Sequence, residues 1–311
     1  MRILVALGGN ALTTEGGDGG PDDQMVAVAR ASADMAALLQ AGHELLITHG
    51  NGPQVGRILV KNELAANVLP PIPLDWCGAS TQGTIGFILM NALEAALSRV
   101  GLERRTAAVV TRTLVALDDP GFDNPTKPIG SFASREKAEH LTTFGQHWVD
   151  QGDKGWRRVV ASPVPQQILD SAVIRALLDA GFLVIGNGGG GIPVVRNGDG
   201  TLRGIEAVVD KDLGAVVLGH EVGADVLVLA TDVENVVIGW GTPDAKPLGR
   251  VTVSELRELA AAGHFGAGSM GPKVDAACKF VESGGTRSII TSLSRIQDGV
   301  ADEVGTIIEA G

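Results

Sequence analysis

Three lysines occupy positions in the sequence that are unusual for lysines on a solvated helix surface. Lys127 lies between Pro125 and Pro128, Lys211 lies between two aspartates, and Lys273 directly follows a proline. Ammonium groups held on rigid or loop-like backbone can neutralise the charge of a phosphoryl group during its transfer. A surface ion pair would explain each lysine taken alone. Together, and beside the glycine-rich loops below, they indicate phosphate chemistry.

Two carboxylates flank the second of these lysines in the string Asp210-Lys211-Asp212. Aspartates at this spacing can hold lysines or a magnesium ion in place during phosphoryl transfer. Aspartates are also favoured in the first turn of a helix, where the helix dipole stabilises negative charge. The residues alone leave both interpretations open.

Three glycine-rich loops containing asparagine each follow an apolar run of strand length. The positions concerned are Gly8, Gly9 and Asn10, then Gly50, Asn51 and Gly52, and finally residues 186–191. Without a Cβ, Gly8 and Gly9 can turn their N–H groups toward a ligand oxygen, and Asn10 adds a neutral donor. An ordinary strand-to-helix turn also needs glycine. Because ligands bind at the carboxyl ends of parallel strands, we nevertheless expect the three loops to line one crevice.

Other well-known nucleotide and hydrolase motifs are incomplete in this sequence. Gly186, Gly188 and Gly191 have the spacing of a dinucleotide-binding fingerprint, but the Ile-Pro that follows them does not open a helix. The sequence contains no Gly-Lys dipeptide for a Walker loop, no paired histidines for zinc and no Gly-x-Ser-x-Gly elbow. His49 adjoins the second glycine loop, where we expect an orienting or packing role rather than proton transfer.

Composition restricts the class of protein and the kinds of partner. The chain has 311 residues, 44% of them hydrophobic, which is enough to bury a substantial core. A net charge of −11 and scattered arginines argue against a nucleic-acid partner. No apolar run reaches the roughly 18 to 20 residues of a membrane span. We expect a cytoplasmic protein with a small-molecule ligand, and Cys77 and Cys278 as reduced, buried thiols.

Strand and helix patterns alternate along most of the chain, which predicts a mainly parallel sheet with crossover helices. We expect strands at residues 3–7, 45–48, 106–110, 158–161, 182–185, 225–230, 288–291 and 306–309, and helices at 24–40, 53–66, 82–100, 165–180, 212–222, 254–262 and 271–283. Asp22 or Asp23 is expected to cap the first helix. The turn at residues 197–200 predicts a hairpin and therefore some antiparallel pairing.

The alternation is interrupted between residues 118 and 156, where turn-forming residues surround one helical stretch at 135–141. We interpret this segment as an insertion that protrudes from the sheet. The prolines on either side of Lys127 restrict its backbone, so the side chain can be presented at low entropic cost. We therefore hypothesise a lid that delivers Lys127 only when it closes, and that excludes water from the reaction.

Eight short strings resemble the signatures of the amino acid kinase superfamily, and within it of the carbamate kinases, in the same order along nearly the whole chain. They are Gly8-Gly9-Asn10-Ala11-Leu12, His49-Gly50-Asn51-Gly52-Pro53-Gln54-Val55-Gly56, Gln82-Gly83-Thr84-Ile85-Gly86, Asn124-Pro125-Thr126-Lys127-Pro128-Ile129-Gly130, Gly188-Gly189-Gly190-Gly191-Ile192-Pro193-Val194, Val209-Asp210-Lys211-Asp212, Thr231-Asp232-Val233 and Gly268-Ser269-Met270-Gly271-Pro272-Lys273. Two residues depart from the family pattern. Phe87 replaces a tyrosine, which would remove a hydroxyl near the crevice, and Ala161 replaces a proline.

The resemblance implies an α/β fold, a three-layer αβα sandwich with a mainly parallel central sheet and a small protruding lid at about residues 118–156. It implies one domain spanning residues 1–311, in which the N-terminal part (about 1–185) binds carbamate and the C-terminal part (about 186–311) binds nucleotide. It further implies a homodimer.

The activity implied by the resemblance is a reversible, Mg²⁺-dependent phosphoryl transfer between ATP and carbamate, which breaks down to ammonia and CO₂. The implied catalytic residues are Lys127, Lys211, Asp212 and Lys273. The phosphoryl group would be held by Gly8, Gly9 and Asn10, and the carbamate by Gly50, Asn51 and Gly52. The nucleotide would be bound by Asp210, Thr231, Asp232, Val233, Met270 and Gly271. Magnesium would be bound mainly through the nucleotide phosphates. Relatives such as acetylglutamate kinase carry a lysine before the first glycine pair; here Ala6-Leu7 occupy that place, and Lys127 would substitute.

Two other functions remain open at this point. The first is a kinase of the same fold that forms a different acyl phosphate, which a panel of small carboxylates would distinguish. The second is a nucleotide-binding sensor or storage protein without turnover. Loss of a lysine would mark that second class, and all three lysines are present.

Overall fold

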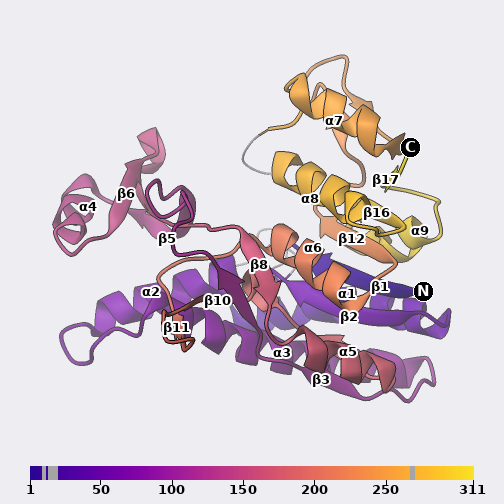
Figure 1. Ribbon diagram of the computed structural model, residues 1–311, viewed down its shortest axis with the longest axis horizontal. Helices are drawn as coiled ribbons and strands as arrows, with labels where there is room; N and C mark the ends of the chain where they lie inside the picture. Colours follow the sequence, from indigo (N-terminus) through magenta and orange to yellow (C-terminus); the bar gives the residue numbers. More distant parts are fainter. Residues whose placement is uncertain (9–11, 13–19, 267–269) are drawn as a thin grey trace.

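The computed structural model describes residues 1–8, 12, 20–266 and 270–311. An eight-stranded sheet runs through the molecule between two layers of helices (Figure 1). Its strands, in spatial order, are β15 (Arg250–Thr252), β17 (Thr306–Glu309), β16 (Arg287–Ser292), β12 (Val226–Thr231), β1 (Arg2–Leu7), β2 (Glu44–His49), β9 (Leu183–Ile185) and β3 (Thr106–Ala108). Neighbouring strands are parallel throughout, except β16 with β17. The predicted α/β fold with a mainly parallel sheet is confirmed.

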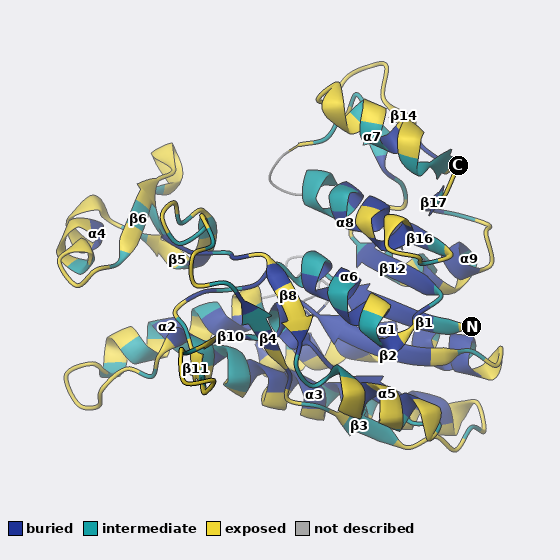
Figure 2. Ribbon diagram, viewed as in Figure 1, coloured by how far each residue is buried: buried dark blue, intermediate teal, exposed yellow. Residues whose placement is uncertain are grey.

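The central strands are apolar along their length because both of their faces are covered. In β1, Ile3, Val5 and Leu7 belong to one core cluster, and Leu4 and Ala6 belong to another on the opposite face. The first cluster involves α1 (Pro21–Gln40), α3 (Leu74–Arg99) and α9 (Ile296–Val300), and the second involves α5 (Ser171–Asp179), α6 (Lys211–Val222), α7 (Val253–Ala261) and α8 (Met270–Glu282). Figure 2 shows these strands as a buried layer. Full burial of each aliphatic side chain contributes roughly 1.5 to 3 kcal/mol.

Two helices begin earlier than the sequence predicted. Helix α1 starts at Pro21, a residue suited to the first helical position; its N-cap is Gly20, so the prediction that Asp22 or Asp23 caps it was wrong. Helix α3 starts at Leu74 rather than at residue 82, with Pro73 at its N-cap. The glycines in its first half weaken the helical pattern in the sequence, and burial of that half compensates. Helix α2 (Gly52–Ala65) lies close to the predicted bounds.

Residues 165–180, predicted as one helix, are divided between a strand and a helix. β8 (Pro165–Ile168) pairs antiparallel with β4 (Arg112–Val115), and α5 follows only after it. The two strands belong to a four-stranded sheet with β10 (Ile192–Arg196) and β11 (Leu202–Gly204), and the antiparallel pair β10–β11 confirms the predicted hairpin. A strand β13 (Val237–Ile238) pairs with β14 (Lys246–Pro247), and short 3₁₀ turns lie at Gly152–Lys154, Gly188–Gly190 and Leu293–Arg295.

The insertion forms a small subdomain that projects from the sandwich, on the left in Figure 1. It contains β5 (Lys127–Ala133), α4 (Arg135–Thr142), β6 (His147–Asp150) and β7 (Trp156–Val160), with antiparallel strand order β5-β7-β6. The predicted helix at 135–141 is therefore confirmed. The strand predicted at 158–161 was wrongly assigned to the main alternation, because it completes the sheet of the subdomain. Among the described residues, no helix combines the length and apolar character needed to cross a membrane.

Candidate active site

The three glycine-rich loops meet because the strands before them are neighbours in the central sheet. Leu7 of β1 pairs with His49 of β2, and Ile47 of β2 pairs with Ile185 of β9. The hydroxyl of Thr48 also donates to the carbonyl of Asn187 over 2.8 Å. The predicted meeting of the loops at the carboxyl edge of the sheet is confirmed for their described residues, whereas Gly9 and Asn10 lie outside that part of the structure.

One detail of the first loop differs from the prediction. The N–H of Gly8 donates to the carbonyl of Ala230 over 3.0 Å, so it does not face a ligand. A Cβ on Gly8 would lie 3.1 Å from the same oxygen, which explains the glycine as a close approach to β12. The N–H of Gly50 is likewise bound, to the carbonyl of Leu7 at 2.9 Å. Anion binding at this edge therefore depends on other groups.

The third loop needs glycine because it packs tightly between the second loop and the start of α6. A Cβ on Gly189 would lie 2.2 Å from Nδ2 of Asn51, and one on Gly190 would lie 2.6 Å from the carbonyl of Val209. Both glycines also have positive φ, where side chains are disfavoured. Gln82 fixes this loop from α3, since its Nε2 donates to the carbonyl of Gly188 over 2.9 Å. Gln82 belongs to one of the eight motif strings, but its bracing role was not predicted.

Two aspartates at the start of α6 bring together the three predicted lysines. Asp210 is the N-cap: its Oδ1 accepts from the N–H of Asp212 over 2.9 Å, and its Oδ2 accepts from Lys127 Nζ over 2.7 Å. Both sequence interpretations of Asp210, a helix cap and a holder of a lysine, are thus confirmed. Asp212 Oδ2 accepts from Lys273 Nζ over 2.9 Å, and Oδ1 pairs with Lys211. The lysines come from β5, α6 and α8.

The three charged side chains of Asp212, Lys211 and Lys273 are largely withdrawn from solvent. The Asp212 side chain is 6% exposed, and those of Lys211 and Lys273 are each 14% exposed. Burial by itself would raise the pKa of Asp212, but the two ammonium groups outweigh burial and hold its pKa at about 2. Burial lowers the pKa of Lys211, an effect that Asp212 opposes and Lys273 reinforces. With Lys127 and Asp210, the group has an excess of one positive charge, which favours a bound anion.

His49 occupies the packing position that the sequence suggested. Its Nδ1 lies 2.9 Å from the carbonyl of Gly50, and a Cβ on Gly188 would lie only 2.3 Å from its Nε2. Complete burial lowers its pKa to about 4. The ring is therefore neutral at physiological pH and supports the second and third loops.

Apart from Asp210 at the start of α6, the residues predicted to bind nucleotide lie at the end of β12 and the start of α8. Thr231 ends β12 and its hydroxyl donates to Asp232 Oδ1 over 2.9 Å, with Val233 next in the turn. Met270 and Gly271 begin α8, and the N–H of Gly271 donates to Gly266 over 3.0 Å. A hollow of about 420 Å³ adjoins the first stretch; it is lined by Thr231 and Asp232, by the 3₁₀ turn after β16 and by α1.

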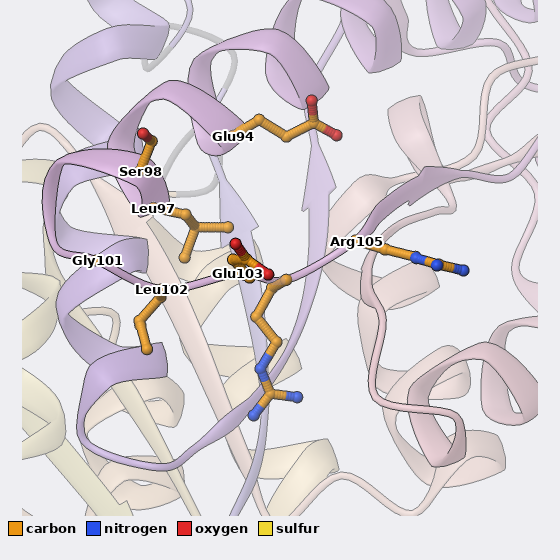
Figure 3. A pocket seen from close by; sticks show the side chains of 8 residues that line it. Glu94, Leu97, Ser98, Gly101, Leu102, Glu103 and Arg105 are labelled. Carbon is orange, nitrogen blue, oxygen red and sulfur yellow. The ribbon is translucent and has the colours of Figure 1, made fainter.

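A second hollow of about 520 Å³ lies away from this edge (Figure 3). It is lined by the end of α3 and the segment before β3, including Glu94, Ser98, Glu103 and Arg105. This is the amino end of β3, whereas the glycine loops follow the carboxyl ends of their strands. None of the predicted site residues lines it.

A profile of the amino acid kinase family matches residues 1–292. The chain belongs to the amino acid kinase family. It is 44% identical to a carbamate kinase of Thermococcus kodakarensis over 98% of each chain, and 44% identical to a carbamate kinase-like protein of Escherichia coli over 99% of this chain and 98% of that protein. Within this kinase family, the structure of a carbamate kinase from Giardia lamblia bound to AMP-PNP superposes with a TM-score of 0.94 at 39% identity, covering 100% of this chain and 98% of that one.

Proposed function

We propose that this chain is a carbamate kinase, which transfers a phosphoryl group reversibly between ATP and carbamate. The observation that carries the proposal is the convergence of Lys127, Lys211 and Lys273 on two aspartates at the carboxyl edge of the sheet. Phosphoryl transfer depends chiefly on positioning and on cations that stabilise the transferring group. The family membership and the AMP-PNP complex of the Giardia relative support the nucleotide as co-substrate.

In the direction of ATP synthesis, the bond between phosphorus and the carbamate oxygen of carbamoyl phosphate breaks. A bond forms between phosphorus and an oxygen of the ADP β-phosphate, and carbamate leaves as an anion that takes up a proton to give ammonia and CO₂. Lys211 and Lys273 stabilise the negative charge on the transferring oxygens, because Asp212 holds both ammonium groups within one small volume. Asp212 also favours the protonated form of Lys211.

We place the carbamate at the second loop, where α2 begins. Asn51 is the N-cap residue of α2, and its side chain does not cap the helix. The first N–H groups of a helix lack intrahelical partners and attract a carboxylate. Gly52 supplies such an N–H, and we assign Gly50 to the same site. We assign the phosphoryl group to the first loop, which consists of Gly8, Gly9 and Asn10. Gly8 allows the close approach of this loop to β12. Gly9 and Asn10 lie outside the described residues.

We assign the nucleotide to Thr231, Asp232, Val233, Met270 and Gly271, at the ends of β12 and the start of α8. Asp210 is a holder of Lys127 rather than a nucleotide ligand in this proposal, because both of its oxygens are engaged. Mg²⁺ would supply further charge neutralisation between the phosphates. Among the described residues no three acidic, histidine or cysteine side chains are grouped for a metal. We propose that Mg²⁺ is held mainly by nucleotide phosphates and water.

The projecting subdomain covers the carbamate side in this proposal, with the C-terminal part of the chain on the nucleotide side. It is attached to α2 through an ion pair between Lys137 and Glu63. Lys127 Nζ lies 2.7 Å from Asp210 Oδ2, at the base of the subdomain. That Lys127 is delivered to the reaction only when the subdomain closes stays a prediction, as does the exclusion of water by the subdomain.

We further propose a homodimer formed through the outer face of α3. Trp76 and Phe87 are 62% and 59% exposed and lie on the same face of this helix. That Phe87 removes a hydroxyl near the crevice stays a prediction. Large exposed apolar side chains on one helical face are typical of an interface. Because ATP is a substrate, we propose that the enzyme works in the cytoplasm.

A coupled assay tests the function. Purified protein with Mg²⁺, ADP and carbamoyl phosphate is expected to form ATP at a rate proportional to enzyme concentration. Acetylglutamyl phosphate in place of carbamoyl phosphate is expected to give no ATP above background.

A kinase for another acid is the second candidate, because a relative of equal identity is described only as carbamate kinase-like. ATP formation from a different acyl phosphate, but not from carbamoyl phosphate, would favour that candidate. Binding of ADP without turnover of any acyl phosphate would indicate a nucleotide-binding protein.

A further inference from the structure

The side chain of Asn51 is held in an unusual way at the proposed carbamate loop. Asparagine at an N-cap normally uses its oxygen to accept from the N–H groups of the first helical turn. Asn51 makes no such bond to α2. Its Nδ2 instead donates to the hydroxyl oxygen of Thr81, on α3, over 2.9 Å.

The hydroxyl of Thr81 determines which end of the Asn51 amide faces it. A threonine hydroxyl has a single proton, and that proton is donated to the carbonyl of Gly78 over 2.7 Å. Toward Asn51 the hydroxyl can therefore act only as an acceptor, so it must face the NH₂ group and not the oxygen. Thr81 is 1% exposed, which keeps water from reversing this arrangement.

The amide oxygen of Asn51 is consequently turned away from Thr81. In the part of the chain that the structure describes, no donor lies within hydrogen-bond distance of this oxygen, and Asn51 is only partly buried. Gly189 lies against the side chain so closely that a Cβ there would be 2.6 Å from Oδ1. The amide is thus fixed on both sides, and the loop presents an acceptor beside the N–H groups at the start of α2.

We propose that Thr81 is a positioning residue that makes the site selective for an acyl phosphate bearing an N–H group on its acyl carbon. Through Thr81, Asn51 offers an oxygen to the amino group of carbamoyl phosphate, while the helix N-terminus receives the oxygens of the same substrate. This inference rests on the proposed function. Acetyl phosphate has a methyl group of similar size in place of the amino group, and would leave the Asn51 oxygen without a partner. A site built around such a hydrogen bond discriminates strongly against an analogue that lacks the donor.

The test compares kcat/KM for ATP formation from carbamoyl phosphate and from acetyl phosphate in Thr81→Val, Thr81→Ala and Thr81→Ser. Valine keeps the shape of threonine but removes the hydroxyl, so the amide can reverse. We expect the preference for carbamoyl phosphate to fall about tenfold in the valine and alanine variants, the scale of one hydrogen bond, with acetyl phosphate turnover changed by less than about threefold. Serine keeps the hydroxyl and is expected to keep the preference.

The outcomes separate this inference from the proposed function. If the unmodified protein forms no ATP from carbamoyl phosphate, the proposed function fails. If it forms ATP and Thr81→Val keeps the full preference, Thr81 does not set the amide and the inference is overturned. An equal loss with both substrates would show a purely structural role, also contrary to the inference. Melting temperatures identify a variant that fails to fold, and the alanine and serine variants then decide the question.

Discussion

Replacing Asp212 by asparagine removes the negative charge that lies between Lys211 and Lys273. The asparagine has nearly the same shape and can still occupy the site. It leaves two ammonium groups, each only 14% exposed, without the carboxylate that both of them contact. The pKa of Lys211, which burial and the charge of Lys273 already lower, is expected to fall further.

The expected loss of stability follows from the pKa of the native carboxyl group. Asp212 is held at a pKa of about 2, against an ordinary value of 3.8. The difference corresponds to roughly 2 kcal/mol in the free energy of unfolding at pH 7, because one pKa unit is about 1.4 kcal/mol. Since the native pKa is the lower one, this stabilisation is complete above about pH 4 to 5 and is lost as the pH falls through 3.8 toward 2.

Turnover of Asp212→Asn is expected to fall at least about 100-fold, the scale for loss of one positioned electrostatic group. The residual rate should also fall as the pH rises, starting at a lower pH than in the unmodified protein, because loss of the Asp212 charge lowers the pKa of Lys211 further. The assay is ATP formation as a function of pH, combined with urea unfolding at pH 7.

Asp275→Asn is the matched control. Asp275 lies on α8, as Lys273 does, and its 37% exposed side chain contacts Arg257 and Lys279. Because solvent screens this pair, we expect a change of less than about 1 kcal/mol and an unchanged rate. The reasoning about Asp212 is refuted if Asp212→Asn keeps its rate within a few-fold, or if it unfolds at the same urea concentration as the unmodified protein.

Three further predictions follow from the site and from α3. Lys127→Ala should lower kcat by about two to three powers of ten and leave ADP affinity nearly unchanged, whereas Lys273→Ala should lower both kcat and ADP affinity. Titration calorimetry with ADP and steady-state kinetics measure the two quantities. A loss of ADP binding in Lys127→Ala that parallels its loss of rate would place Lys127 in the nucleotide site. Trp76→Arg with Phe87→Arg should convert a dimer to a monomer in sedimentation, and an unchanged mass would move the interface elsewhere. His49→Gln should reduce the loss of unfolding free energy as the pH falls from 6.5 to about 4. The pKa of the native His49 ring is lower than that of the ring in the unfolded chain, so the unfolded chain takes up the proton first. An equal pH dependence of the unfolding free energy in the variant and the unmodified protein would contradict this.

The pattern of apolar runs predicted seven of the eight strands of the central sheet, all except β15, and the edge at which the site lies. β1, β2 and β12 are apolar on both faces, and glycine-rich or polar residues begin where their apolar side chains end. Such a pattern depends only on nearest neighbours along the chain, so it is visible in the sequence. The eight ordered motif strings added the family, because their glycines and charges stand where the shared fold requires them.

The tertiary structure alone decided which groups are free to act. Lys127 and Asp210 are separated by 83 positions, and Lys273 and Asp212 by 61, so no local pattern relates them. The N–H of Gly8 was predicted to bind a ligand, yet β12 lies beside it and accepts that hydrogen bond. Similarly, the sequence of β7 predicts a strand but not the sheet to which the strand belongs. Its pairing with β5 places it in the sheet of the subdomain.

The sequence by itself therefore determined the kinds of residue at the site, the sheet edge that carries them and the family. The partners of each polar group were decided by tertiary structure, because a donor or acceptor satisfied by a distant segment is no longer available to a ligand. Asn51 illustrates both contributions. Its place in a glycine loop after a buried strand is a property of the sequence, whereas the direction of its amide depends on Thr81 of a different helix.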